Sequence, residues 1–243
     1  MGTVVTVDVY TTDGQAGDEV SRQLATALEL LQRADAVFST WNRRSPISRL
    51  RRGEITCSQA PAEVCEVLEL CATARELSGG WFDPWAMPGG IDPTGYVKGW
   101  AAQRALGAFC AGHVSGAIVN AAGDIASFGG LGHDQPFSIG ISDPLSPMRL
   151  AAVVRLTGAI ATSGTYERGS HLIDPHSGRP AARVASASVT GPDLGLADAL
   201  ATAIAVAGAS SLALVEALDG YEALVIAGDG TLRWTERFPF AVR

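Results

Sequence analysis

An aspartate and a threonine four residues apart offer the clearest metal-binding chemistry in this sequence. Asp198 and Thr202 lie in an apolar helical pattern, and residues at this spacing share one helix face. A carboxylate and a hydroxyl suit Mg²⁺, which usually completes its shell with water and phosphate oxygens. A structural alternative stays open, since Asp198 suits the positive end of a helix dipole and Thr202 can bond its own backbone carbonyl.

A second segment combines small hydroxyl residues with a histidine. Thr162, Ser163 and Gly164 end an expected strand, where backbone N–H groups can face an anion. His171 opens the next expected strand and offers a general base or a donor to phosphate. A histidine at a strand edge is more often structural, so that alternative also stays open. Asp174 follows just before a turn.

Residues 79–95 are rich in Gly, Pro, Trp and Asp. Such a stretch is a linker or a site, and we expect a site because linkers rarely hold two tryptophans and a phenylalanine. Phe82 and Asp83 lie near its start and Asp92 near its end. Lys98 follows early in a helix, where a basic charge opposes the dipole. A bound anion would explain it, and a solvated lysine is the alternative.

A turn at residues 120–124 holds Asn120, Gly123 and Asp124, and by itself it is generic. The sequence contains no Gly-x-x-x-x-Gly-Lys-Ser/Thr loop and no Gly-x-Ser-x-Gly elbow. A Gly-x-Gly-x-x-Gly motif after a strand is also absent. These motifs therefore point to none of the corresponding nucleotide or hydrolase sites.

The elements that must position these residues come in blocks of helices and strands, which is typical of the α+β class. Alternating apolar residues predict strands, and apolar residues at helical spacing predict helices. Helices are expected at about 18–37, 60–77, 96–109, 196–207 and 210–218. Strands are expected at 3–11, 117–120, 137–141, 150–156, 160–163, 171–173, 185–190, 222–226 and 232–235. A polar segment at residues 39–50 separates the first two helices.

The composition of the 243 residues supports a sizeable core, since 47% are hydrophobic and only 18% are charged. The net charge is −7 and no Lys/Arg run stands out, which argues against a nucleic-acid partner. The four cysteines do not have the spacing of a zinc site, and we expect buried, reduced thiols.

No apolar run approaches the ~20 residues that a membrane-spanning helix needs. The first residues alternate as a strand does and carry no signal-peptide pattern. We therefore expect a cytoplasmic protein, or an extracytoplasmic one from which a leader has been removed.

Together and in this order, these segments resemble the ApbE family of FAD:protein FMN transferases, without the lipoprotein leader common in that family. The resemblance rests on seven segments: Ser39-Thr40-Trp41 through Ser45 and Leu50, Gly80-Trp81-Phe82-Asp83-Pro84, Asp92 with Lys98-Gly99, Asn120 with Gly123-Asp124, residues 161–164, His171 with Asp174-Pro175, and Asp198 with Thr202. Each segment is weak alone, but seven in order are specific.

The resemblance implies a single α+β domain over residues 1–243, with mixed and antiparallel sheets flanked by helices around a flavin cleft. It implies FAD as substrate together with Mg²⁺, which Asp198, Thr202 and the backbone carbonyl of Gly95 would bind. Trp41 would lie against the flavin, and His171 matches a histidine that the family requires. The other cofactor-binding positions it implies are Met1, Ser39, Phe82, Asp83, Asp92, Lys98, Asn120, Gly123, Asp124, Thr162, Ser163, Gly164 and Asp174.

The implied reaction transfers the FMN half of FAD to a Thr or Ser hydroxyl of an acceptor flavoprotein through a phosphoester bond, with release of AMP. His171 is the first candidate for the base, with Asp92 or Asp174 behind it, and Lys98 would bind phosphate charge. Two alternatives stay open: an FAD pyrophosphatase, in which water replaces the acceptor hydroxyl, and a non-catalytic flavin-binding protein.

Two departures from the family pattern mark this chain. Only residues 85–91 separate the segment that ends at Pro84 from Asp92, where the family commonly has a longer insertion. Ala122 stands where the family often has glycine, a change that could alter the approach of the backbone to the cofactor.

Overall fold

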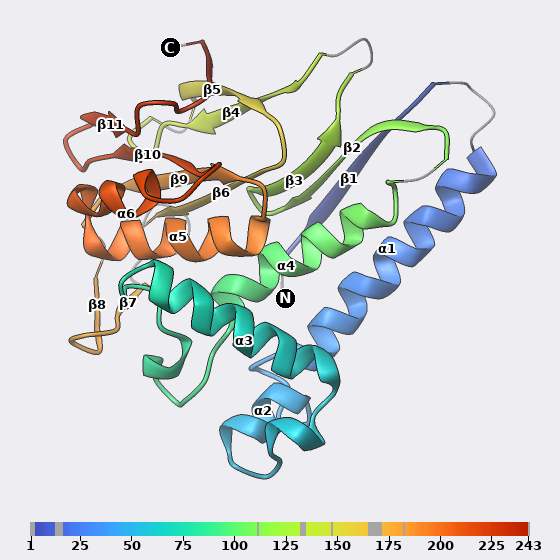
Figure 1. Ribbon diagram of the computed structural model, residues 1–243, viewed down its shortest axis with the longest axis vertical. Helices are drawn as coiled ribbons and strands as arrows, with labels where there is room; N and C mark the ends of the chain where they lie inside the picture. Colours follow the sequence, from blue (N-terminus) through green and yellow to red (C-terminus); the bar gives the residue numbers. More distant parts are fainter. Residues whose placement is uncertain are drawn as a thin grey trace.

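A computed structural model describes residues 3–12, 17–110, 112–131, 135–146, 148–164, 172–181 and 183–242. Its centre is a seven-stranded antiparallel sheet of order β1-β2-β3-β6-β9-β10-β11 (Figure 1). These strands are β1 (Val5–Thr11), β2 (Val114–Ala121), β3 (Asp124–Gly129), β6 (Ala159–Gly164), β9 (Ser186–Gly191), β10 (Glu222–Ile226) and β11 (Leu232–Trp234).

Two smaller antiparallel sheets accompany it. One has the order β12-β5-β4, from β4 (Phe137–Ser142), β5 (Leu150–Leu156) and β12 (Phe240–Val242). The other is a short hairpin of β7 (Ile173–Asp174) and β8 (Arg179–Pro180).

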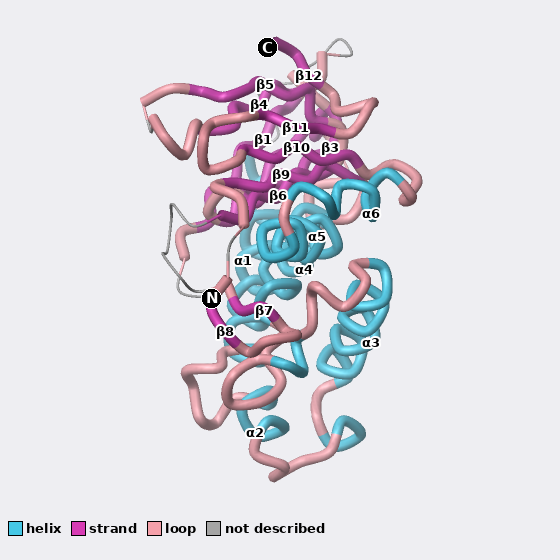
Figure 2. The backbone as a smooth tube through the Cα atoms, turned by 90° about the vertical axis from the view of Figure 1, so that its left-hand side faces the viewer, coloured by secondary structure: helices cyan, strands magenta, loops and turns pink. Residues whose placement is uncertain are grey.

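The helices lie on one side of the large sheet, while β4 and β5 lie on the other (Figures 1 and 2). Helices α1 (Gly17–Phe38), α4 (Thr94–Gly107) and α5 (Leu194–Ala207) pack against the sheet. Beyond them lie α2 (Pro46–Arg51) and α3 (Ala62–Leu77), as Figure 2 shows. The remaining helices are α6 (Leu212–Glu216), η1 (Cys57–Gln59), η2 (Pro84–Ala86) and η3 (Ala209–Ser211).

The apolar pattern explains the layers. All six residues of β9 are buried because that strand is covered on both faces, whereas β1 at the sheet edge alternates more and less exposed residues over most of its length. Helix α5 is apolar nearly all round, as expected for a helix buried between layers. Among the described helices, none is both long and apolar enough to cross a membrane.

The α+β class is confirmed, and most expected elements form within a few residues of their predicted bounds. The polar segment at 39–50 is not wholly irregular, because α2 begins within it and ends one residue beyond it. Ser45 caps that helix by accepting a hydrogen bond from the Ser48 amide (3.1 Å), and Pro46 occupies its first turn. A helix of six residues is too short to show a helical period in the sequence.

The expectation of four reduced thiols is wrong for two of them. Cys57 and Cys65 form a disulfide that ties η1 to the first turn of α3, with their Cα atoms 5.7 Å apart. The turn through η1 makes this approach possible, and the sequence spacing alone did not indicate it. Cys71 and Cys110 are free, and burial raises the pKa of the Cys71 thiol to about 12.

Candidate functional site

Helices α4 and α5 meet backbone to backbone. A Cβ atom added to Gly99 would lie 2.4 Å from the carbonyl oxygen of Leu194, and one added to Gly195 would lie 2.7 Å from the ring of Tyr96. Real side chains cannot occupy those spaces, so glycine permits the contact. This close approach carries Lys98, which precedes Gly99, toward Asp198 on α5.

Two buried carboxylates meet at this contact. Asp124, the first residue of β3, is 0% exposed, and Asp198 is 3% exposed. Lys98 forms an ion pair with Oδ2 of Asp124, while the other oxygen of Asp124 accepts a hydrogen bond from the Thr162 amide (3.1 Å). Oδ2 of Asp198 is buried and has no hydrogen-bond partner among the described residues.

The electrostatics of this pair favour an added cation. Burial raises the pKa of Asp198, and the negative charge of Asp124 raises it further, against the opposing effects of Lys98 and the Gly99 amide. When both carboxylates are ionised they share one ammonium group, which leaves an excess negative charge out of water. The uncompensated oxygen of Asp198 therefore fits a hard divalent cation.

Hydroxyl groups from β6 and α5 line the same place. Ser163 Oγ and Thr202 Oγ1 lie 3.0 Å apart, and Thr162 Oγ1 lies 2.8 Å from Ser188 Oγ. The structure thus brings Asp198, Thr202 and the end of β6 together. Among the described residues no group of three or more His, Cys, Asp or Glu side chains could hold a metal, so hydroxyl, carbonyl, water or phosphate oxygens would have to complete a shell.

Two of the predicted aspartates organise the loop before α4. Asp83 caps η2 by accepting from the Trp85 amide (2.9 Å) and pairs with Arg75 (2.6 Å). Asp92 accepts from the amide (3.1 Å) and hydroxyl (2.6 Å) of Thr94, the first residue of α4. Both carboxylates are therefore already engaged within the protein.

The loop also packs against the first turn of α4. Phe82 is buried, and its ring lies 3.3 Å from the position that a Cβ atom on Gly95 would take. Gly95 is thus held beside the loop at the start of the helix that carries Lys98.

The turn between β2 and β3 places Asp124. The side-chain oxygen of Asn120 accepts a hydrogen bond from the Gly123 amide (2.8 Å), and Gly123 has φ +93°. Ala122 has φ +52°, the single positive φ of a non-glycine residue in the described ranges. This left-handed conformation is the one that glycine adopts freely, so Ala122 carries strain next to the site.

The β7–β8 hairpin lies over residues 80–81. Asp174 accepts from the His176 amide (2.9 Å), and the His176 ring contacts Trp81 edge-on at 4.5 Å. Although burial opposes it, the hydrogen bonds from His176 and Ser177 hold the pKa of Asp174 below its ordinary value.

The remaining predicted residues divide into two groups. Ser39 accepts hydrogen bonds at its carbonyl from the hydroxyls of Ser45 (2.6 Å) and Ser48 (3.1 Å), and Trp41 is 94% exposed. Met1 and His171 lie outside the described residues. The roles of Trp41 and His171 toward FAD therefore stay predictions.

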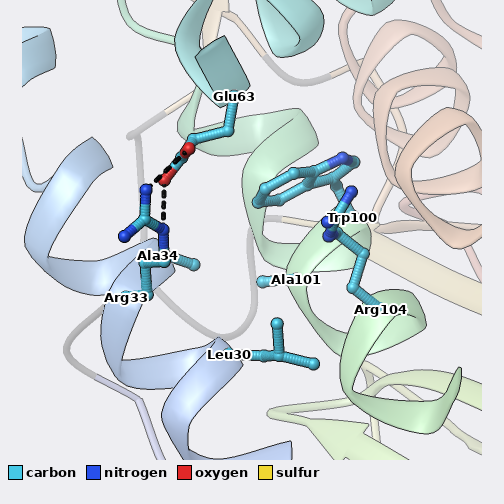
Figure 3. A pocket seen from close by; sticks show the side chains of 7 residues that line it. All are labelled: Leu30, Arg33, Ala34, Glu63, Trp100, Ala101 and Arg104. Carbon is cyan, nitrogen blue, oxygen red and sulfur yellow. Dashed lines mark hydrogen bonds and ion pairs between the residues drawn. The ribbon is translucent and has the colours of Figure 1, made fainter. Parts of the chain in front are cut away.

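A small cavity of about 100 Å³ lies between α1, α3 and α4, and neither of the two buried carboxylates lines it (Figure 3). The cavity is lined by the ion pair between Arg33 and Glu63 (2.6 Å) and by Trp100. Arg104 also lines it, with its guanidinium 4.9 Å from the ring centroid of Trp100. Ligand pockets usually span about 300–1,000 Å³, so this cavity is too small for a dinucleotide.

One group of residues that the sequence reasoning missed surrounds α2. Five arginines lie within ten residues, but they form no continuous Lys/Arg run because residues 45–48 and Leu50 interrupt them: Arg43, Arg44, Arg49, Arg51 and Arg52. The number of arginines in this short segment is the sequence feature that indicates a local positive charge.

The sequence model of the ApbE family matches residues 1–90 and 87–225. The chain belongs to the ApbE family. The resemblance predicted from the seven segments is thereby confirmed, and the buried Asp124–Asp198 pair lies within the matched part of this ApbE chain.

A curated relative, the FAD:protein FMN transferase of Rhodobacter capsulatus, is 35% identical over 152 residues. The match covers 58% of this chain but 29% of the relative, so this ApbE chain spans less than a third of the relative's length.

Solved structures of ApbE proteins share the fold. The ApbE protein of Thermotoga maritima is 23% identical with a TM-score of 0.78, covering 97% of this chain and 94% of that one. The flavin transferase ApbE of Vibrio cholerae is 21% identical with a TM-score of 0.77, over 97% and 94% of the two chains. The flavinyl transferase ApbE of Pseudomonas stutzeri is 21% identical with a TM-score of 0.76, and the match covers 97% of this chain and 92% of that one.

Proposed function

We propose that this chain binds FAD with Mg²⁺ and transfers the FMN moiety to a Thr or Ser hydroxyl of an acceptor flavoprotein, releasing AMP. The observation that carries the proposal is the buried oxygen of Asp198, which lacks a donor beside the Lys98–Asp124 pair. Family membership and the name of the Rhodobacter capsulatus relative support the transfer of FMN from FAD to a protein.

The residues that would hold the metal are Asp198, Thr202 and the backbone carbonyl of Gly95. When bound there, Mg²⁺ would withdraw charge from the phosphate oxygens of FAD. Lys98 would add a second positive charge beside the phosphates, because its ammonium group reaches the Asp124 carboxylate at the same site. The Ser163 and Gly164 amides would donate to phosphate oxygens.

The transfer breaks the phosphoanhydride bond of FAD and forms a phosphoester bond to the acceptor. The acceptor hydroxyl oxygen bonds to the FMN-side phosphorus, and the bond from that phosphorus to the bridging oxygen breaks, so AMP leaves with that oxygen. A base takes the hydroxyl proton. His171 suits this role better than Asp174, whose lowered pKa makes it a weaker base, or Asp92, which already accepts two hydrogen bonds from Thr94.

The test is incubation with FAD, Mg²⁺ and a candidate flavoprotein acceptor. We expect the acceptor mass to increase by the FMN moiety while AMP appears on chromatography. Asp198→Asn should abolish both products, whereas Asp219→Asn, which changes an exposed aspartate in the turn after α6, should keep them. Chelation of Mg²⁺ should act like Asp198→Asn.

Two results would contradict this proposal. AMP together with free FMN, without modified acceptor, would instead identify an FAD pyrophosphatase. Full transfer by the Asp198→Asn variant would remove Asp198 from the site.

A further inference from the structure

The charge of this chain is distributed unevenly. The whole chain carries −7, yet residues 41–54 hold five arginines and a single acidic residue, Glu54. This stretch includes α2, at the end of the molecule away from β4 and β5 (Figures 1 and 2). A local positive surface on an acidic protein favours a negatively charged partner.

Glu54 does not neutralise this surface. Arg52 pairs with Glu54 at 2.6 Å, and Arg49 lies 3.8 Å from the same carboxylate. The hydrogen bond from Arg52 lowers the pKa of Glu54, so it stays ionised at neutral pH and one negative charge serves two arginines. Arg52 also donates to the carbonyl of Arg43 (2.7 Å), which orients the arginines around a common hollow.

Within the part of the chain that the structure describes, Arg43 and Arg44 are the arginines of the group that form no ion pair. Both are exposed, and no carboxylate among the described residues lies within ion-pair distance of either guanidinium. With Arg49, Arg52 and Glu54 they line an open hollow in the surface. We call these five residues the arginine surface. The indole of Trp41, 94% exposed, lies two residues before Arg43.

The arginine surface is joined to the proposed flavin site through Arg51. Arg51 donates to the carbonyls of Pro88 (3.1 Å) and Gly89 (3.2 Å) and lies 3.7 Å from Asp92. Asp92 in turn holds the first turn of α4, and Lys98 follows one helical turn later, about 6 Å along the axis. The arginine surface therefore lies beside the loop that leads into the site.

We propose that the arginine surface docks an acidic segment of the acceptor protein next to its flavinylated Thr or Ser. Guanidinium groups match carboxylates in pairs of parallel hydrogen bonds, and an exposed tryptophan adds apolar contact at an interface. Complementary charge accelerates the encounter of two proteins and fixes its register. This inference rests on the proposed function, since FMN transfer requires an acceptor polypeptide at the mouth of the site.

The test measures binding of two fluorescein-labelled peptides by anisotropy. One carries a threonine among glutamates, and the other carries glutamine in place of each glutamate. We expect the wild-type chain to bind the glutamate peptide at least about ten-fold tighter at low salt, and the difference to fade at high salt. Arg43→Glu/Arg44→Glu should remove the difference. Arg22→Glu/Arg155→Glu, exposed arginines on α1 and β5 with the same change in charge, should retain it.

Three outcomes would overturn the docking proposal: equal binding of both peptides by the wild type, equal loss in both variants, or binding of phosphatidylserine vesicles that depends on Arg43 and Arg44 while peptide binding does not. FAD binding, followed by flavin fluorescence, should be unchanged in Arg43→Glu/Arg44→Glu. If the arginine surface fails while Asp198→Asn still abolishes AMP release, the proposed function survives. If peptide discrimination holds while Asp198→Asn stays active, the metal assignment fails and the docking surface remains.

Discussion

At the scale of single residues, Asp198 is costly to keep. Its carboxylate is buried, lacks a donor to one oxygen and lies beside a second buried carboxylate, Asp124. Burying charge without a partner destabilises a fold, and a protein retains such a group where a ligand supplies the missing partner. Under the proposed function, the Asp198 carboxylate lowers the stability of the unliganded chain and provides a ligand for the cation.

Asp198→Asn should accordingly stabilise the unliganded protein while abolishing transfer. The amide keeps the shape but removes the buried charge, and we expect the free energy of unfolding to increase by about 1–3 kcal/mol. Urea unfolding without Mg²⁺ measures this change, with Asp219→Asn as the control that should leave the midpoint unchanged. A less stable Asp198→Asn variant would show that the carboxylate is satisfied within the fold.

The sequence predicted part of this site for a physical reason. Asp198 and Thr202 are four apart on one helix, so local geometry alone puts them on one face. The ion pair between Lys98 and Asp124 could not be predicted from the sequence. The packing of α4 against the sheet brings these two residues together, and their spacing along the chain does not indicate it. The turn that holds Asp124 is generic by itself, and only the family resemblance predicts a role for this residue.

At the scale of elements, Arg51 connects α2 to the loop before α4. Its guanidinium is mostly buried and bonds two loop carbonyls and one carboxylate, whereas Arg49 on the same helix is exposed. Gly89 makes this possible: with φ +82°, its missing Cβ would lie only 2.9 Å from the Arg51 side chain. The loop between Asp83 and Asp92 is short in this chain, and the hydrogen bonds from Arg51 hold its backbone at Pro88 and Gly89.

Arg51→Ala should release the loop at residues 84–92. Losing charge-assisted hydrogen bonds at a mostly buried position should lower the free energy of unfolding by about 1–3 kcal/mol and speed amide exchange in that loop. Urea unfolding and hydrogen exchange measure the two effects. Arg49→Ala, which removes a surface ion pair, should change stability by under about 1 kcal/mol. Unchanged exchange in the Arg51→Ala loop would contradict this role.

At the scale of the whole molecule, several buried groups make stability depend on pH. Burial raises the pKa of Cys71 from 9.0 to about 12 and that of Tyr221 to about 12, and it raises the pKa of Tyr96 as well. At a pH between the ordinary pKa of such a group and its raised pKa in the folded chain, the group loses its proton in the unfolded chain and keeps it in the folded chain. The folded state then binds more protons, so stability falls as the pH rises.

Cys71→Ala should reduce this dependence. One group contributes a slope of up to about 1.4 kcal/mol per pH unit, and the variant should lose that part between about pH 9 and pH 12. Free energies of urea unfolding at several pH values measure the slope independently of the packing lost with the thiol. Cys110→Ala removes an exposed thiol and should change the slope less. An unaltered slope in Cys71→Ala would contradict the assignment.

The class and most elements were predictable because a sheet between two layers imposes strong apolar patterns on β5, β9 and α5. The order of the strands was not, since register and pairing depend on contacts distant in the sequence. Short strands and edge strands such as β8 and β12 bury few side chains, so their sequences show no clear alternation of apolar and polar residues.

The contact between Gly99 and Leu194 has a mechanical consequence. Two helices that touch along their main chains have no compressible layer of side chains between them, so their separation is set by atomic radii. Substitutions elsewhere in the core change the volumes of side chains but do not change the distance between α4 and α5. Substitution can therefore accumulate around α4 and α5 while the spacing between Lys98 and the Asp198 carboxylate stays constant, provided that no side chain enters at Gly99 or Gly195.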